Sequence, residues 1–301
     1  MKNIFITSII FLATVLQMQA QHLSDAYYAQ TIDQTQINPA YAKQGEDSKL
    51  TVFHRSLLSG IDGAPSNTAI SFLKPLDENT GVGGRLTSDT RGVFSTLLLE
   101  GMYAYQISMS ENESVTLGVS GGFRKTDIDM GSLDGQYVDL DDPTLMADNF
   151  GGYKFMAGAG AVYRQTQQGL ELGVSIPTLV SHEGSLTDFV VAHGSVKLAV
   201  GNQLALKPNV IYQVLPNSKN QWQGTAQLEV KEKFWAMAGY RSNKSLIAGA
   251  GVKLNKLDLG YAYSASGGML NDLSSGGHEL KLSFSFPNKG KGVEVDAPVE
   301  E

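Results

Sequence analysis

The chain has 301 residues, a formal net charge of −7, 33 glycines and no cysteine. Without cysteine, the protein cannot be stabilised by disulfides or by a cysteine-ligated zinc site. The acidic charge balance also argues against nucleic-acid binding, which requires a basic surface.

The first twenty residues have the parts of a secretory signal peptide. A positively charged start is followed by an apolar run from Ile4 to Leu16, and the small residue Ala20 stands before the expected cleavage point. The apolar run is too short for a membrane-spanning helix, which needs about 20 residues. Residue 21 is Gln21 and not cysteine, so no lipoprotein anchor is expected. We predict a signal peptide over 1–20.

Beyond residue 48, apolar residues alternate with polar or small residues along many short segments. In the last segment Leu280, Leu282 and Phe284 alternate with Lys281 and Ser283. A strand with lipid on one face and a barrel interior on the other requires this alternation. The predicted strands are 49–57, 66–74, 80–88, 92–108, 113–128, 153–165, 168–178, 187–200, 202–215, 220–231, 233–243, 245–254, 256–266 and 276–286.

The lengths of the connections carry independent information. The connections after even-numbered strands are short, whereas most of those after odd-numbered strands are longer, with 129–152 the longest. Outer-membrane barrels have short periplasmic turns and longer extracellular loops. The sequence therefore predicts an all-β fold in the cell outer membrane, a transmembrane antiparallel β-barrel of about fourteen strands. Its divisions are a periplasmic leader segment over 21–48, the barrel over 49–286 and a flexible C-terminal tail over 287–301.

Side chains along the strands predict two faces of the barrel wall. Charges within strands, such as Glu100, Arg124, Lys197 and Lys207, should face the lumen, because a lipid-facing charge near the midplane costs about 2–4 kcal/mol. They could line a channel or fill the lumen with ion pairs. Glycines within strands, such as Gly160, should relieve curvature or crowding in the lumen. Aromatic residues at strand ends should form interfacial girdles: Tyr103, Tyr105, Tyr153, Tyr163, Trp222, Trp235, Tyr240, Tyr261 and Tyr263.

Residues that could carry chemistry are few. The five histidines show no metal-ligand spacing, and no segment resembles a nucleophile motif. A Ser–His–acid site assembled in space remains open, because triads are not sequence motifs. Carboxylates in the longest connection, Asp134, Asp139, Asp141, Asp142 and Asp148, could hold calcium, but the run lacks the glycine and the later glutamate of a calcium loop. We therefore expect a solvated loop and a protein that has no enzymatic activity, no cofactor and no metal.

Several short segments, in order along the chain, resemble those of one family. Ile37-Asn38-Pro39-Ala40-Tyr41-Ala42 is similar to the motif that opens members of the PorP/SprF family of type IX secretion outer-membrane proteins, and Gly60-Ile61-Asp62-Gly63-Ala64-Pro65 resembles the loop after their first strand. Further similar segments are Asp142-Pro143, Asn149-Phe150-Gly151, Leu172–Pro177 and Gly276–Leu280. Two departures are Lys43, where glycine usually stands, and Thr178, where asparagine is usual.

The resemblance implies a binding function in the type IX secretion apparatus of gliding and related bacteria. Members of the family either assist secretion and surface anchoring of a partner, often an adhesin with a C-terminal secretion domain, or connect the barrel to periplasmic components. The expected partners are outer-membrane lipid, the C-terminal domain of a secreted cargo protein, and periplasmic and outer-membrane components of the secretion system. The alternative is an outer-membrane channel or hydrophobic-solute transporter on the same fold.

Two regions are candidates for partner contact. The longer loops, above all 129–152, are expected to contact cargo. The leader is expected either to contact periplasmic components or to plug the barrel. The candidate residues are Asn38, Pro39, Tyr41, Gly60, Asp62, Gly63, Pro65, Asp141, Asp142, Pro143, Asn149 and Phe150.

Overall fold

Antiparallel strands form nearly all of the regular structure. The computed structural model describes residues 34–132, 151–181, 190–215, 219–265 and 274–287. Its strands are β1 (Ser48–Ser56), β2 (Ser66–Pro75), β3 (Thr80–Arg91), β4 (Phe94–Ser108), β5 (Glu113–Ile128), β6 (Tyr153–Gln165), β7 (Leu170–Ser181), β8 (Val190–Val196), β9 (Leu198–Ala199), β10 (Leu204–Val214), β11 (Gln221–Val230), β12 (Phe234–Arg241), β13 (Leu246–Leu254), β14 (Leu257–Ser264) and β15 (Gly277–Phe286). Three short 3₁₀ turns accompany them: η2 (Gln34–Gln36), η3 (Pro39–Ala42) and η4 (Met130–Ser132).

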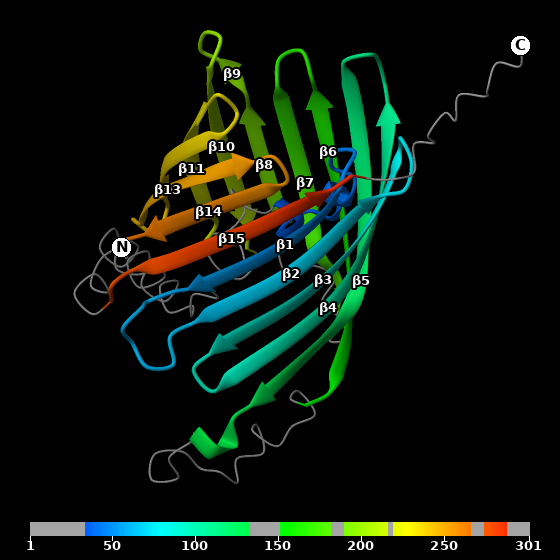
Figure 1. Ribbon diagram of the computed structural model, residues 1–301. Helices are drawn as coiled ribbons and strands as arrows, with labels where there is room; N and C mark the ends of the chain where they lie inside the picture. Colours follow the sequence, from blue (N-terminus) through cyan, green and yellow to red (C-terminus); the bar gives the residue numbers. More distant parts are fainter. Residues whose placement is uncertain (1–33, 133–150, 182–189, 216–218, 266–273, 288–301) are drawn as a thin grey trace, which may run out of the picture.

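The sheet closes on itself. Consecutive strands pair antiparallel, β1 pairs with β15, and β10 pairs with β11, so the wall has no break in the order of its strands (Figure 1). Strands β8 and β9 both pair with the same edge of β10 and are separated only by Lys197, so they count as one interrupted strand of the barrel. The prediction of a fourteen-stranded barrel is confirmed. Closure gives each strand of the barrel a hydrogen-bonded neighbour on both sides, which a sheet in lipid requires.

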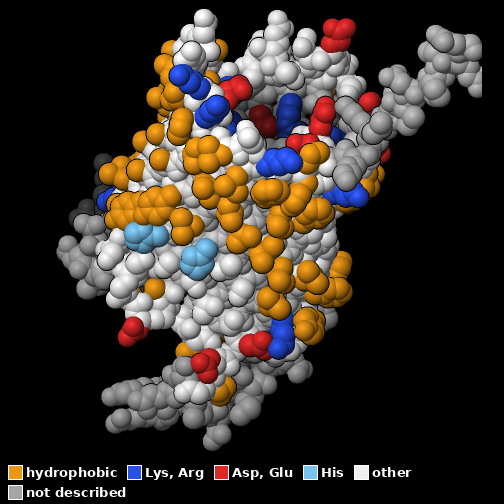
Figure 2. Space-filling model, viewed as in Figure 1, with side chains coloured by type: hydrophobic (Ala, Val, Ile, Leu, Met, Phe, Trp, Pro, Cys, Tyr) orange, Lys and Arg blue, Asp and Glu red, His pale blue; other side chains and the backbone are white. Residues whose placement is uncertain are grey.

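The two faces of the wall differ as the alternation predicts. Large apolar side chains such as Leu99, Val119 and Leu280 are exposed on the outside, whereas Ser71, Thr116 and Ser283 are buried inside. Figure 2 shows hydrophobic side chains across the middle of the visible wall, with most Lys, Arg, Asp and Glu toward its two ends. This band is the surface that meets the hydrocarbon of the membrane.

Charged residues predicted within strands do pair across the inside of the wall. Glu100 on β4 forms an ion pair with Arg85, and Lys197, which lies between β8 and β9, forms one with Glu229 at 3.1 Å. Lys207 lines an internal cavity together with Glu229. The charges are therefore kept away from lipid and are largely compensated by neighbouring strands.

Eight of the nine predicted girdle residues are exposed or partly exposed, but the prediction for Trp235 is wrong. Trp235 points inward and packs with Met237, Ile247 and Ala262. Its neighbour Phe234 is exposed and occupies the outward position at that strand end. Gly251 makes room for the indole, because a Cβ at Gly251 would lie closer than 3.0 Å to the Trp235 ring. With two adjacent aromatics, only the register of the strand decides which one faces lipid.

Within the described part of the chain, no helix is long and apolar enough to cross a membrane.

The apolar band predicts a depth-dependent effect of charge. Val119 lies near the middle of β5 and faces outward, whereas the outward-facing Ile107 is next to the end of β4. Val119→Arg should lower the free energy of unfolding by about 2–4 kcal/mol, and Ile107→Arg by about 0–1 kcal/mol. Urea titration of the refolded barrel in lipid vesicles measures both values. Equal effects of the two substitutions would contradict the assigned lipid-facing band.

Candidate functional site

A segment of the leader lies inside the barrel. We call residues 34–43 the lumen segment; it contains η2 and η3. Ile37, Asn38, Ala40, Tyr41 and Ala42 are each at most 1% exposed. In Figure 1 the segment (blue) lies within the barrel beside β5, β6 and β7. It blocks part of the lumen at the end where the short turns lie, in the position of a plug.

The sequence Asn38-Pro39 builds the local structure of this segment. Asn38 caps η3, and its side-chain Oδ1 accepts a hydrogen bond from the N–H of Ala40 at 3.0 Å. Pro39 occupies the first position of η3, where a missing N–H costs no internal hydrogen bond. Asparagine at the cap followed by proline therefore favours a turn at this point, before any contact with the wall is made.

The Asn38 amide also fastens the segment to the wall. Its Nδ2 donates to the carbonyl of Ala161 on β6 at 3.1 Å and to the carbonyl of Val174 on β7 at 3.3 Å. The Ser175 hydroxyl donates to the carbonyl of Ile37 at 2.5 Å. One side chain thus caps the turn with its oxygen and binds two strands with its nitrogen.

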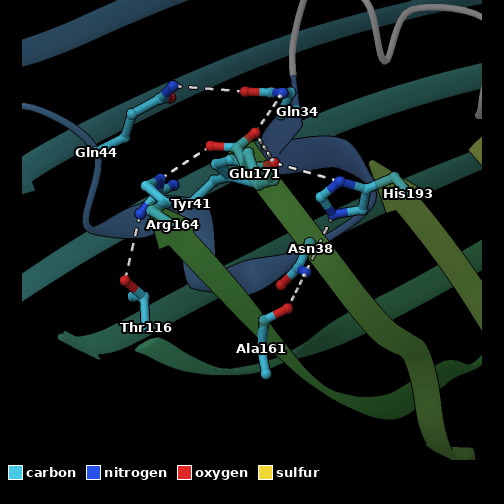
Figure 3. A network of polar contacts seen from close by, with 9 residues as sticks. All are labelled: Gln34, Asn38, Tyr41, Gln44, Thr116, Ala161, Arg164, Glu171 and His193. Atoms are coloured by element: carbon cyan, nitrogen blue, oxygen red, sulfur yellow. Dashed lines mark hydrogen bonds and ion pairs between the residues drawn. The ribbon is translucent and has the colours of Figure 1, made fainter. Parts of the chain in front are cut away.

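Tyr41 is the centre of a second set of contacts (Figure 3). Its hydroxyl donates to Glu171 Oε1 at 2.6 Å, and Arg164 Nε donates to Glu171 Oε2 at 2.9 Å. The Arg164 guanidinium lies 5.3 Å from the centre of the Tyr41 ring, and the His193 ring lies 5.6 Å from it. Burial and the negative charge of Glu171 raise the pKa of the Tyr41 phenol above its ordinary value, so the hydroxyl remains a donor.

Further polar contacts hold the start of the lumen segment. Gln34 Nε2 donates to Glu171 Oε1 at 3.2 Å, and Arg85 Nη1 donates to the carbonyl of Thr35 at 3.0 Å. Arg85 is in turn paired with Glu100. The segment is thereby hydrogen-bonded to β3, β6 and β7, and β4 supports it indirectly through the Arg85–Glu100 ion pair.

Three glycines form the surface against which the segment packs. A Cβ at Gly81, Gly118 or Gly160 would lie closer than 3.0 Å to atoms of Ala42, Ala40 or Asn38, respectively. No side chain can occupy these sites unless the segment moves. The expectation that Gly160 relieves crowding in the lumen is confirmed, and the crowding partner is Asn38.

The second group of candidate residues lies at the opposite end of the barrel. We call residues 57–65, which connect β1 to β2, the rim loop; Gly60, Asp62 and Gly63 in it are exposed, and Pro65 is partly exposed. The loop is docked on its neighbours, since Ser59 exchanges backbone hydrogen bonds of 2.9 Å with residues 275 and 276, and the Gly63 carbonyl accepts one from Gly92. Gly60 and Gly63 have φ of 96° and 70°, a conformation that favours glycine.

The structure therefore separates the candidates for partner contact into an interior and an exterior group. Asn38, Pro39 and Tyr41 are buried in the lumen, and the rim-loop residues lie at the other end. Asp141, Asp142, Pro143, Asn149 and Phe150 fall outside the described residues. Contact of any of these residues with a partner remains a prediction.

Sequence reasoning missed the residues that receive the lumen segment. Arg164, Glu171 and His193 lie on neighbouring strands, and the alternation of those strands places all three on the inner face. The sequence signal that could have revealed this surface was the clustering of inward-facing polar residues on adjacent strands. Among the described residues, no three or more His, Cys, Asp or Glu side chains come together in a group that could hold a metal. The acidic connection considered for calcium lies outside them.

Comparison with known proteins identifies a family and similar folds. Residues 19–284 match the family described as type IX secretion system membrane protein PorP/SprF. No curated protein matches the chain at a significant level.

Among solved structures, the CymD monoaromatic hydrocarbon channel has a TM-score of 0.52 at 12% identity, over 87% of this chain and 94% of that chain. Omp33 of Acinetobacter baumannii has a TM-score of 0.48 at 12% identity, over 81% and 100%. The toluene transporter TodX of P. putida has 0.49 at 8% identity, over 83% and 93%. At these identities the likeness to CymD shows the barrel fold alone.

The packing at Gly118 can be tested with a matched glycine. Gly118→Ala would place a methyl group against the backbone of Ala40 and should destabilise the barrel by about 1–3 kcal/mol through overpacking. Gly101→Ala is the control, because a Cβ at Gly101 has nothing closer than 3.9 Å. It should be neutral or stabilising by up to about 1 kcal/mol. Urea unfolding measures the stability of both variants, and proteolysis measures how accessible the leader is in each. Equal stability and equal protease sensitivity of the two variants would contradict the described packing.

Proposed function

The chain belongs to the PorP/SprF family of type IX secretion system membrane proteins, and on this basis we propose that it acts by binding, without catalysis. The proposed function is to assist secretion or surface anchoring of a partner protein that carries a C-terminal secretion domain. On the periplasmic side, the same barrel contacts components of the secretion and gliding apparatus.

The observation that supports a binding role most directly is the lumen segment. A transporter needs a passage for its solute, whereas here a capped turn is bonded to several strands inside the barrel. Glycines on the wall are fitted to it. A lumen occupied by a closely packed segment favours a barrel that binds partners over one that transports a solute.

The two ends of the barrel fit two kinds of partner. Short turns face the periplasm in outer-membrane barrels. The lumen segment therefore lies near the periplasmic end, where periplasmic components would bind. The rim loop, with Gly60, Asp62 and Gly63 exposed, lies at the outer end with the long connection 129–152, and we assign cargo contact to these two.

The alternative function, a channel or hydrophobic-solute transporter, makes a different prediction about conductance. In planar bilayers the intact protein should conduct little. Deletion of residues 34–43 should open the lumen and raise the conductance. Asn38→Asp keeps the capping oxygen but loses the donor to the Ala161 and Val174 carbonyls, so it should conduct intermittently.

The control for this experiment is folding of each variant, measured by its heat-dependent migration in detergent gels. High conductance of the intact protein, unchanged by deletion of residues 34–43, would favour the transporter.

The assignment of cargo contact can be tested on cells. Deletion of residues 133–148 should abolish surface display of one secreted protein while the barrel remains folded, because the deletion leaves β5 and β6 intact on either side. Replacing the same residues by a Gly/Ser stretch of equal length is the matched variant and should have the same effect. Pull-down of the intact protein from native membranes identifies the partner. Unchanged secretion in both variants would contradict the assignment.

A further inference from the structure

A cavity lies between the lumen segment and the part of the wall that faces it. The segment is hydrogen-bonded to β3, β6 and β7, whereas the cavity, of about 150 Å³, is bordered by β1, β2 and β10–β15. Gln34, Thr35 and Gln44 of the leader form its other side. The charged groups that line it are Lys49, Lys207, Lys253, Lys281, Glu229 and Asp258.

Positive charge is in excess around this cavity. Lys281 pairs with Asp258 at 2.8 Å. Glu229 pairs with Lys197 at 3.1 Å, so both carboxylates of the cavity are already engaged. Within the described part of the chain, Lys207 forms no direct ion pair. A cleft lined mainly by one sign of charge attracts ligands of the opposite sign, although the chain as a whole carries −7.

Two buried oxygen atoms of the residues that line the cavity need a hydrogen-bond donor. Lys281 is bonded to Oδ2 of Asp258, whereas the buried Oδ1 of the same carboxylate has no hydrogen-bond partner among the described residues. The buried Oδ1 of Asn209 on β10 likewise has none there. A buried acceptor without a donor is costly, so a ligand that fits this cavity brings a donor with it.

The ligand must therefore carry negative charge for the lysines and an O–H group for the acceptors. An ionised carboxylate offers acceptors only, and so does sulfate. Inorganic phosphate keeps at least one proton at neutral pH and offers both. A water molecule would supply a donor but would leave the positive charge uncompensated. The size also agrees, because an apolar cavity of about 150 Å³ holds benzene, and a phosphate ion is smaller.

We propose that this cavity is a binding site for inorganic phosphate. The ion would be held by Lys207 and Lys253 and would donate its O–H to Oδ1 of Asp258. It would thereby connect the leader to β10–β15. Access is from the short-turn end, where a second cavity of about 520 Å³ shares Gln44 and Lys49 with the first. The proposal does not depend on the identity of any protein partner.

A comparison of two ions tests the proposal on the intact protein. Calorimetric titration of the full chain in detergent, in a phosphate-free buffer at constant ionic strength, should show saturable one-to-one binding of phosphate. Sulfate has the same shape but no proton at neutral pH, so it should bind about tenfold more weakly, since a site built to bond a hydroxyl rejects an analogue without one. Equal affinity for the two ions, or no saturable binding of phosphate, would overturn the proposal.

Asp258→Asn tests the atom that selects between the ions. Lys281 has only donors, so it would keep the remaining side-chain oxygen, and the amide NH₂ would take the place of Oδ1. Phosphate and sulfate should then bind with similar affinity. A preference for phosphate as large as in the natural protein would overturn the assignment of Asp258 Oδ1 as the acceptor.

Lys207→Gln tests the contribution of charge. It should weaken the binding of phosphate about tenfold, because a hydrogen bond to a charged group is lost. Lys125→Gln is the matched control: Lys125 pairs with Asp127 away from the cavity, so the affinity should be unchanged. Heat-dependent migration in detergent gels verifies that each variant is folded. An equal affinity of Lys207→Gln and the natural protein would overturn the proposal.

Fluorescence places the bound ion in the cavity. The chain has two tryptophans, of which Trp235 lines the cavity and Trp222 is exposed on the outer face. In Trp222→Phe, phosphate should therefore change the remaining fluorescence with the same midpoint as in calorimetry. No change at saturating phosphate would overturn the location of the site.

A phosphate monoester distinguishes the free ion from the phosphate group of a larger molecule. Glycerol 3-phosphate should bind more weakly than inorganic phosphate, because its additional atoms do not fit a cavity of about 150 Å³. Tighter binding of the monoester would overturn the assignment of the free ion as the ligand.

Discussion

A strand in the hydrocarbon of a membrane finds no water for its N–H and C=O groups, so the sheet must close on itself. Pairing of β1 with β15 and of β10 with β11 completes that closure. Once the wall is closed, its two faces have different solvents, and every strand must alternate. Closure also creates an interior, and the content of that interior decides whether the barrel conducts or only binds.

Part of the interior of this barrel is filled by its own chain. Asn38 and Tyr41 reach three neighbouring strands, and glycines on the wall leave the space that the lumen segment occupies. The segment and the surface that receives it thus depend on each other. Without the wall, polar groups of residues 37–42 would lack their hydrogen-bond partners, and without the segment, the space beside the glycines would be empty. This dependence is the reason for the proposal that the barrel acts by binding. Beside β10–β15 the segment leaves a cavity of about 150 Å³ whose lining includes Lys207, Lys253 and Lys281.

Most of the fold could be predicted, and the error at Trp235 shows why the rest could not. Alternation along single strands was enough to locate all fourteen strands of the barrel and to predict that Glu100 and Lys207 face the lumen. At β12, however, Phe234 and Trp235 are both aromatic, and either could face lipid. Packing of the indole with Met237 and Ile247 from neighbouring strands settles the choice. Such contacts cross the sheet and leave no periodic trace in the sequence.

The sequence by itself determined the barrel, its number of strands, its short-turn and long-loop ends and its family resemblance. These are consequences of local periodicity and of motifs read within a few residues. Only the tertiary structure decided that Asn38 binds Ala161 and Val174, 123 and 136 residues away, and that Tyr41 binds Glu171. The physical reason is that strand closure, and not sequence proximity, brings β6 and β7 to the leader. A polar motif between signal peptide and barrel could equally have faced the periplasm.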